Sequence, residues 1–526
     1  MRLLYFALVP VLAAAQVTIA VDASKQIGRF PHSWAYFGYD EPNYTTAPNG
    51  RRLIHELAAT SESPIHIRTH FLLATGNGES GLKWGSTNAY TEDASGKPIY
   101  DWAISDKILS TLVDSGVIPL VEIGFMPRAL STHPDPYQPN WQPGKTKNED
   151  YFIGWTYPPK DYDKWGQLVF AWVSHCVERF GRAQVQQWDW EVWNEPDIAY
   201  WHGTPMEYDK LYDYAAAAVR RAVPNARVGG PASTGPASPK AAEFLRQFLQ
   251  HCSDTNVPLD FISFHAKGRP VAAGDHVRMD IDKELSDAEA GFDIVASYPQ
   301  FQKLPVLLTE ADPEGCAACS ARVYPQNAYR NGQLYPAYEA AAYKRLVDLA
   351  AAKQIHLEAV TTWAFEFEGQ PYFDGFRDLA TNGIDKPVLN LFRMAGMVGD
   401  PRVEAFSSSA PSIDVMAGRG DRRLAILVWN YRDDDSSGQT TPVGVNVSGL
   451  PKRVLVRHYR IDSANSNSYT IWKQLGSPQT PTPEQYGELE RAGQLALLQS
   501  PEWIDTRRIL TFDLPLESVS LLELTW

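Results

Sequence analysis

The chain has 526 residues, which is too many for one domain of average size. Its formal net charge of -14 argues against a nucleic-acid-binding protein, because binding to phosphates requires a basic face. Neutral sugars are not excluded. The 16 Trp and 25 Tyr residues suit stacking on sugar rings, although large barrels also bury many aromatic side chains.

Residues 1–15 have the pattern of a secretory signal peptide. A charged second residue precedes the apolar stretch 3–12, and the three alanines at 13–15 fit a cleavage site. That stretch is too short to span a membrane, and no other segment is long and apolar enough. We therefore expect a secreted, extracellular protein that is not held in a membrane. Two motifs for N-glycosylation agree with this expectation, at Asn43 and Asn446.

Between residues 34 and 400, eight β-prone stretches alternate with eight helical patterns. The predicted strands are 34–40, 65–72, 117–124, 188–195, 226–230, 259–265, 304–310 and 359–363. The predicted helices are 49–60, 101–114, 161–180, 206–222, 240–251, 277–297, 337–353 and 386–397. Eight such alternations are what a single (β/α)8 TIM barrel requires, and that fold builds its sites at the C-terminal ends of the strands.

From residue 401 to 526 the pattern changes to short alternating strands separated by turn residues, as at 424–429 and 454–459. This pattern predicts an accessory antiparallel β-sandwich. Residues 16–33 have no place in an eight-strand count that begins near residue 34, so we expect this segment to join the sandwich. The predicted fold class is therefore α/β, a (β/α)8 barrel at 34–400 with an accessory sandwich.

Four cysteines are present, two of them in the short motif Cys316-Ala-Ala-Cys319. In an oxidising compartment Cys316 and Cys319 can close a small disulfide loop. A zinc site would need more ligands nearby than the sequence offers, so no metal or other cofactor is expected. Cys176 and Cys252 lie on predicted helices that are two positions apart around a barrel, and either can be a buried free thiol.

Two glutamates close predicted strands: Glu195 follows Asn194 at the end of the fourth, and Glu310 ends the seventh. Either could simply begin the following helix. However, three strand–helix units separate them, which places them across the barrel mouth from each other. Glycoside hydrolysis needs such a pair, because one carboxyl protonates the leaving oxygen and the other attacks the anomeric carbon. Apolar surroundings near Trp193 and a positive charge such as Arg68 could set the two pKa values apart.

Six motifs occur in an order that resembles glycoside hydrolase family 39, the family of β-xylosidases and α-L-iduronidases. They are residues 67–70, 121–127, 157–162, 191–197, 261–265 and 308–310. The resemblance implies a retaining mechanism with Glu195 as acid/base and Glu310 as nucleophile. It also implies that Asn194 holds the sugar 2-hydroxyl and that further residues after the strands contact the sugar, namely His70, His265, Trp363 and one of Glu366 and Glu368, of which we choose Glu366. We add Phe125 and Lys267 to the predicted sugar contacts.

Two departures from the family's β-xylosidases border the sugar. Lys267 follows His265-Ala266 where those enzymes usually have Tyr, and Ala311 follows Glu310 where they usually have Trp. The mechanism should survive, but β-xylosidase activity is put in doubt. Lys267 can bind a charged or differently hydroxylated sugar, or it can pair with a nearby carboxylate.

The leading prediction is an exo-acting retaining glycosidase that trims oligosaccharides or polysaccharide side chains of plant-type or matrix glycans. The sugar removed can be xylose, arabinose, galactose or a uronic acid. An endo-glycanase with an open cleft is the first alternative, and a pocket closed by the long loop at 132–160 would speak against it. A non-catalytic carbohydrate-binding protein is the second, although such a protein does not need both glutamates. The sequence does not give the oligomeric state.

Overall fold

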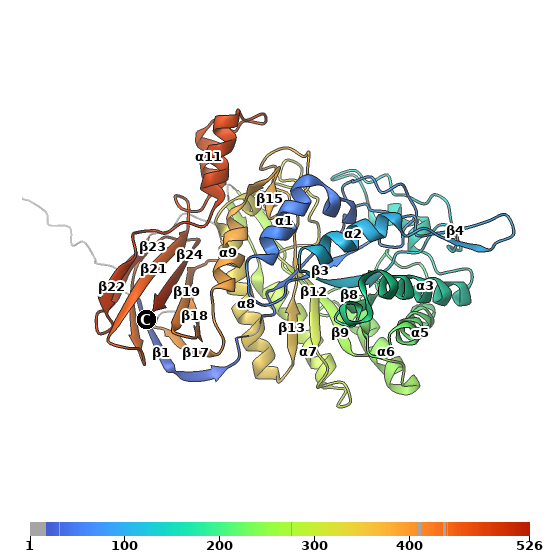
Figure 1. Cartoon of the computed structure of the whole chain (residues 1–526), viewed down its shortest axis with the longest axis horizontal. Helices are drawn as coiled ribbons and strands as arrows, with labels where there is room; N and C mark the ends of the chain where they lie inside the picture. Colours follow the sequence, from blue (N-terminus) through green and yellow to red (C-terminus); the bar gives the residue numbers. More distant parts are fainter. Residues whose placement is uncertain (1–16, 31, 275, 409–411, 435–437, 439) are drawn as a thin grey trace, which may run out of the picture.

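The computed structural model describes residues 17–30, 32–274, 276–408, 412–434, 438 and 440–526. The predicted signal peptide at 1–15 lies outside the described residues. Within them, a barrel and a second sheet lie beside each other (Figure 1). Among the described helices, none is both long enough and apolar enough to cross a membrane.

The barrel is a parallel sheet of nine strands in the order β13-β12-β9-β8-β7-β6-β3-β2-β14. It is closed in effect, because β13 and β14 at its two ends are consecutive pieces of the predicted eighth strand. The predicted (β/α)8 barrel is therefore confirmed. Its strands are β2 (Tyr36–Tyr39), β3 (His66–Thr69), β6 (Ile118–Ile123), β7 (Asp189–Val192), β8 (Arg227–Ser233), β9 (Phe261–Lys267), β12 (Val306–Asp312), β13 (Leu357–Val360) and β14 (Thr362–Trp363).

A helix follows each barrel strand and covers its outer face (Figure 1). Local sequence explains where these helices begin. Before α5, for example, Thr204 accepts a bond from the Glu207 backbone N–H while the Glu207 side chain accepts one from Thr204, which is a capping box. The helices are α1 (Pro48–Ala58), α2 (Ala103–Asp114), α3 (Tyr162–Phe180) with the short α4 (Arg182–Val185), α5 (Pro205–Ala222), α6 (Pro239–Thr255), α7 (Ile281–Ala296), α8 (Leu334–Lys353) and α9 (Pro387–Gly396).

Strand β7 shows how the barrel sorts its side chains. The Trp190 ring meets Trp172 of α3 at 5.7 Å, so Trp190 faces the outer helices. Because side chains alternate along a strand, Glu191 then points to the barrel interior. There it pairs with Arg68 of β3, and both side chains are fully buried. Polar residues of the barrel interior thus lie directly beneath the mouth.

Short elements complete the loops of the barrel. Three hairpins are β4 (Tyr90–Glu92) with β5 (Pro98–Tyr100), β10 (Val271–Ala273) with β11 (His276–Arg278), and β15 (Ala380–Thr381) with β16 (Ile384–Asp385). Four 3-10 helices are η1 (Pro42–Thr46), η2 (Asn148–Tyr151), η3 (Gly154–Thr156) and η4 (Pro325–Asn331).

The accessory domain is one curled sheet of nine strands, in the order β22-β21-β24-β19-β18-β17-β1-β20-β23. The N-terminal β1 pairs antiparallel with β17 and parallel with β20, so residues 17–21 join this domain as expected. The parallel pair makes the sheet mixed, where a purely antiparallel sandwich was predicted. The strands are β1 (Val17–Gly28), β17 (Arg402–Ser407), β18 (Ile413–Gly420), β19 (Arg423–Asn430), β20 (Thr441–Ser448), β21 (Arg453–Ile461), β22 (Glu502–Asp505), β23 (Leu510–Leu514) and β24 (Ser518–Thr525).

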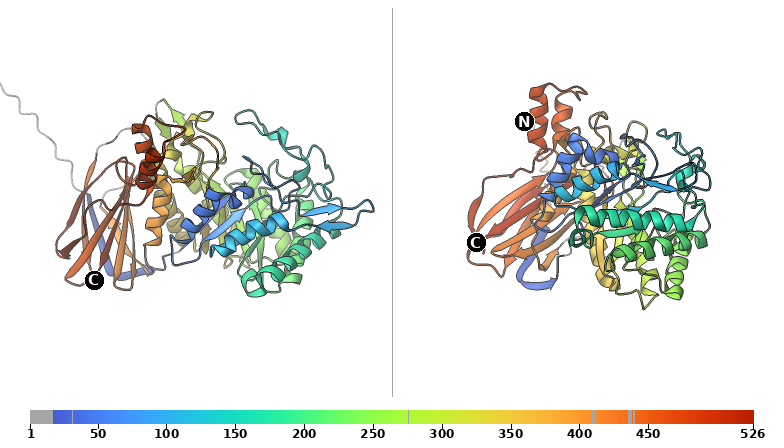
Figure 2. Two further views of the ribbon diagram at one scale, coloured as in Figure 1. Left: turned by 45° about the horizontal axis from the view of Figure 1, so that its top comes forward. Right: turned by 45° about the vertical axis from the view of Figure 1, so that its right-hand side comes forward.

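Two helices that the sequence analysis did not predict are inserted between β21 and β22. They are α10 (Ser468–Gln474) and α11 (Pro483–Gly493), and they stand together above the sheet (Figures 1 and 2). Trp472 and Leu489 from this pair pack with Phe373 and Ile384 of the loop after the eighth barrel strand. The accessory domain therefore supports one of the loops at the barrel mouth.

One predicted glycosylation site is wrong for the folded protein. Asn43 lies in η1 and is only 3% exposed. Its side-chain amide donates to the Ser86 carbonyl oxygen and accepts from the Ser86 backbone N–H, each at 2.9 Å. A glycan at Asn43 would have to break both bonds and open the core, whereas Asn446 is exposed on β20 and stays a prediction.

The cysteines divide into one disulfide and two free thiols. Cys316 and Cys319 are joined in the loop after β12. Cys176 on α3 and Cys252 on α6 are buried and unpaired.

Candidate active site

The two predicted catalytic glutamates meet at one end of the barrel. Glu310 lies in strand β12, two residues before the strand ends, and Glu195 follows β7 by three residues. Trp193 and Glu195 both have positive φ angles, of 71° and 46°, which residues other than glycine rarely adopt. A bond from the Glu195 backbone N–H to the Ala232 carbonyl oxygen, 2.8 Å long, holds this turn. Such strained backbone often marks a functional site.

One carboxylate oxygen of Glu195, one carboxylate oxygen of Glu310 and one ring nitrogen of His265 lie within 4.8 Å of one another. The His265 Nδ1 atom is 3.0 Å from Glu195 Oε1 and 3.9 Å from Glu310 Oε2. Retaining glycosidases hold their carboxyl groups roughly 5–5.5 Å apart, whereas inverting enzymes need roughly 6.5–9.5 Å to admit a water. The spacing fits attack by one carboxylate itself.

Positive charge surrounds the Glu310 carboxylate. The Lys267 Nζ atom lies 2.8 Å from one oxygen and the Arg68 Nη1 atom 3.2 Å from the other. Burial alone would raise the pKa of Glu310. The positive charge of Lys267, together with that of Arg68, instead holds this pKa well below its usual range. Glu310 is therefore a carboxylate at neutral pH, as a nucleophile must be.

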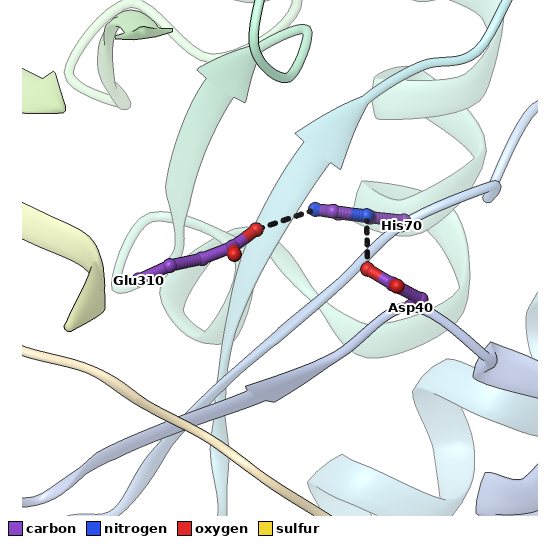
Figure 3. Close-up of side chains that lie close together, drawn as sticks. All are labelled: Asp40, His70 and Glu310. Atoms are coloured by element: carbon purple, nitrogen blue, oxygen red, sulfur yellow. Dashed lines mark ion pairs between the residues drawn. The ribbon is translucent and has the colours of Figure 1, made fainter. Parts of the chain in front are cut away.

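His70 lies between Asp40 and Glu310 (Figure 3). Its contact with Arg68 defines which ring nitrogen carries the proton. Arg68 Nη1 can only donate, so His70 Nε2 accepts this bond at 2.9 Å. The proton is then on Nδ1, which lies 3.0 Å from Asp40 Oδ1. Burial, followed by the charge of Arg68, lowers the pKa of His70 to about 4, so the ring is neutral at neutral pH. Asp40 also pairs with Lys83.

Glu195 has quite different surroundings. Its side chain is 17% exposed, against 6% for Glu310, and its polar contact is the His265 ring. Two phenols, Tyr151 and Tyr200, stand close by with their rings 5.2 Å apart. Burial chiefly raises the pKa of both phenols, and the negative charges of Asp40 and, to a smaller extent, Glu195 add to this increase.

Lys267 pairs with carboxylates, which was one of the two alternatives for it. Besides Glu310, its Nζ atom lies 2.6 Å from Asp312 Oδ2. The Arg377 guanidinium reaches the same Asp312 oxygen at 3.4 Å and also pairs with Glu314. Positive and negative groups thus alternate from Glu310 into the loop after β12. Because Lys267 remains 15% exposed at its side chain, it also borders the site.

Asn194 is held by the same arginine that contacts the nucleophile. Arg68 Nη2 donates to Asn194 Oδ1 at 2.9 Å, and Arg68 Nε donates to Glu191. Nearby Glu122 is fully buried and neither of its oxygens has a hydrogen-bond partner among the described residues. Burial raises the pKa of Glu122 well above its ordinary value. Neither Glu191 nor Glu122 was assigned a role from the sequence.

Phe125 and Trp363 brace the site from beneath. Phe125 is fully buried, with its ring 5.8 Å from His70 and 4.3 Å from Trp155. Trp363 is buried under His70, 4.5 Å between ring centres, and its Nε1–H donates to Asp40 Oδ1 at 3.1 Å. Both rings therefore position His70, and their predicted contact with the sugar stays a prediction.

Glu366 lies in the loop after β14. Its carboxylate accepts a 2.6 Å bond from the Gly383 backbone N–H, and its charged neighbours are Asp378, Glu368 and Asp385. Burial raises the pKa of Glu366 to about 8. Its predicted contact with the sugar stays a prediction.

Comparison with known proteins points to one enzyme family. The family model described as glycosyl hydrolases family 39 matches residues 17–497. A β-xylosidase of Caldicellulosiruptor saccharolyticus is 29% identical over 433 residues, covering 80% of this chain and 82% of that protein. The human α-L-iduronidase is 27% identical over 378 residues, 62% of this chain and 55% of that protein.

Solved structures show the same fold. The crystal structure of a family 39 enzyme from Xanthomonas axonopodis pv. citri matches with a TM-score of 0.79 at 21% identity, covering 99% of this chain and 100% of that one. A monomeric β-xylosidase from Caulobacter crescentus matches with a TM-score of 0.78 at 22% identity, covering 97% and 99%. At these identities the likeness supports the fold of barrel plus accessory domain.

Proposed function

We propose that this chain, which belongs to glycosyl hydrolases family 39, is a retaining exo-glycosidase with Glu195 as acid/base and Glu310 as nucleophile. The observation that carries the proposal is the pair of carboxylates within 4.8 Å of each other, one of them surrounded by positive charge. Two carboxyl groups so close together can act as acid/base and as nucleophile only if their surroundings differ, and the surroundings of Glu195 and Glu310 do differ.

In the first step the Glu310 carboxylate attacks the anomeric carbon while Glu195 gives its proton to the leaving oxygen. The product is a glycosyl ester on Glu310. Its formation removes the negative charge at Glu310, and Glu195 is left as a carboxylate because it has given up its proton. In the second step Glu195 takes a proton from water while the water oxygen attacks the anomeric carbon, which breaks the ester and frees the Glu310 carboxylate.

The residues around the pair support these steps. Lys267 and Arg68 keep Glu310 ionised and aimed by direct bonds of 2.8 and 3.2 Å. His265 Nδ1, at 3.0 Å, fixes the Glu195 carboxyl group. Asn194, whose carbonyl oxygen is held by Arg68, leaves its amide N–H groups for the hydroxyl next to the anomeric centre.

The contacts of Lys267 indicate which kind of sugar is removed. An ammonium group has three N–H donors, and Glu310 and Asp312 take two of them. One donor is left for a hydroxyl or a carboxylate of the terminal sugar. We therefore propose a substrate of the xylosidase or iduronidase type, with a uronic acid or a hydroxylated pentose or hexose at its end.

Exo action is supported by the loop at 132–160. Trp155 of this loop packs against Phe125, and its carbonyl oxygen accepts a 3.2 Å bond from the Met126 backbone N–H. The loop is thus fixed to the strand that precedes it, beside the catalytic pair, which favours a pocket over an open cleft.

A panel of aryl glycosides tests the proposal: β-xyloside, α-L-arabinofuranoside, β-galactoside and iduronide. We expect turnover of at least one, and an NMR time course that shows the first product with unchanged anomeric configuration. Inversion would contradict the mechanism. An absence of turnover on all four, with cleavage inside a polysaccharide chain, would favour the endo-glycanase.

We also propose that the protein is secreted, on the pattern of residues 1–15 and the exposed Asn446 motif. Expression in a eukaryotic host followed by N-terminal sequencing of the medium protein tests this. A mature chain that still begins at Met1 would reject the signal peptide.

A further inference from the structure

A row of four aromatic rings lies on the loops beside Glu195. His133 stacks on Tyr157 at 4.2 Å, Tyr157 on His202 at 4.8 Å, and His202 meets Phe152 at 4.2 Å. The outermost ring, Phe152, is 55% exposed. We call these four rings the aromatic row: His133, Tyr157, His202 and Phe152.

Two loops build the row and are tied to each other. His133, Phe152 and Tyr157 come from the loop after β6, and His202 comes from the loop after β7 that also carries Glu195. The His202 backbone N–H donates to the Thr156 carbonyl oxygen at 2.9 Å, and His202 Nδ1 bonds Thr156 Oγ1 at 2.8 Å. The row is therefore a fixed feature of the mouth.

A single exposed phenylalanine is ordinary on a protein surface. The position of Phe152 makes it informative. Its neighbour Tyr151 contacts Tyr200, and the Trp193 Nε1–H donates to the Tyr200 carbonyl oxygen at 3.0 Å. Trp193 lies two residues before Glu195. The loop that carries Phe152 is thus connected through Tyr151 and Tyr200 to the segment that carries Glu195.

The chemistry of the site says what must pass over this surface. The acid/base protonates the leaving oxygen, so the part of the substrate that departs lies on the Glu195 side. Pyranose rings have apolar C–H faces that pack flat on aromatic rings, while their hydroxyls bond at the rim. Burial and the neighbouring His133 lower the pKa of His202, so this ring is neutral at neutral pH and suits a neutral sugar.

We infer that the aromatic row binds the sugar units of the leaving group, those that follow the terminal sugar removed at Glu195 and Glu310. This inference rests on the proposed function. It names the natural substrate as an oligosaccharide of at least three units, one of whose leaving rings packs on Phe152, the exposed end of the row, because His202 already contacts Tyr157 and Phe152.

The test compares two substrates of the sugar that the aryl glycoside panel identifies: its glycosyl fluoride, which has no leaving sugar, and a trisaccharide that it terminates. For Phe152→Ala we expect kcat/KM to fall about tenfold on the trisaccharide, as an aromatic contact allows, and to stay within about twofold on the fluoride. Phe152→Trp should restore the trisaccharide rate. Phe406→Ala is the matched control, because Phe406 is a 65% exposed phenylalanine on β17 of the accessory sheet.

Equal losses on both substrates would mean a general disturbance of the site and would overturn the inference. Unchanged rates on both would overturn it as well. In either case turnover by the unaltered protein leaves the proposed function standing, whereas an absence of turnover on every glycoside rejects both.

Discussion

The ends of strands β12 and β7 carry the same functional group in opposite surroundings. Glu310 on β12 is buried against Lys267 and Arg68, at 2.8 and 3.2 Å. Glu195 after β7 is more exposed, and its carboxylate lies 3.0 Å from the His265 ring nitrogen Nδ1. The comparison teaches that the assignment of nucleophile and acid/base is made by neighbouring charge and burial.

The Glu310 side is also the deeper of the two. Behind Lys267 the charges continue through Asp312 and Arg377 to Glu314, and Arg330 joins Glu314 to the carbonyl oxygens of Cys316 and Cys319. Removing one partner from such a buried set leaves another buried charge unpaired, which lowers the free energy of unfolding by roughly 3–5 kcal/mol. The end of β12 should therefore tolerate substitution less well than the end of β7.

Glu310→Ala should have the largest effect. Without the nucleophile, kcat/KM should fall by about four orders of magnitude or more on every substrate, measured with the best aryl glycoside of the panel. Glu502→Ala, at an exposed glutamate of β22, is the control and should leave the rate unchanged. More than about a tenth of the activity left in Glu310→Ala would break the comparison.

Glu195→Ala should depend on the leaving group. A good aryl leaving group needs little protonation, so the glycosyl ester still forms, while its hydrolysis slows because no base remains. Added azide needs no general base and should restore turnover, giving a glycosyl azide of unchanged configuration. Rescue of that kind in Glu310→Ala, with none in Glu195→Ala, would show that the roles are reversed.

Lys267→Met tests the charge beside Glu310. Because the positive charge holds the pKa of Glu310 below its usual range, its loss should raise that pKa. Activity requires ionised Glu310, so the acid limb of the kcat/KM profile should move up by about one pH unit or more, with activity lost as the pH falls. Lys267→Arg keeps the charge and should move the limb less. An acid limb that does not move in Lys267→Met would mean that Lys267 does not control the ionisation of Glu310.

The paired change Cys316→Ser with Cys319→Ser should have the smallest effect. A disulfide that closes so short a loop contributes about 2 kcal/mol. We expect a thermal midpoint lower by a few degrees, with kcat within about threefold, because the ion pairs around Glu310 remain. A tenfold loss of kcat at a temperature where the variant is folded would show that the loop itself sets the nucleophile.

The sequence was sufficient for the barrel because its strand and helix periods are regular, and for Glu195 and Glu310 because both close strands. The same strand-end argument applies to Asp40, which directly follows Tyr39 of β2 but was not singled out. Asp312 was missed because the seventh strand was predicted to stop at 310, two residues before its end. In a strand, residues two apart share a face, so Asp312 and Glu310 reach the same lysine.

Other features depend on contacts between distant segments. The Asn43 motif looks like a glycan acceptor, but its amide pairs with Ser86, 43 residues away. Glu366 follows the eighth strand, but its loop folds toward Gly383 and α11. The helices α10 and α11 are short, and their apolar residues pack on that loop. The local signal for the start of α11, a capping box of Thr482 and Gln485 with Pro483 between them, was missed.

The most direct test of the central claim is to trap the glycosyl ester. A 2-deoxy-2-fluoro derivative of the preferred aryl glycoside slows both steps, and its hydrolysis more than its attachment, so a covalent intermediate accumulates. Peptide mass spectrometry of the inactivated protein then locates the sugar. The account predicts one sugar per chain, attached to Glu310. A label on Glu195, or continued full activity with no label at all, would contradict it.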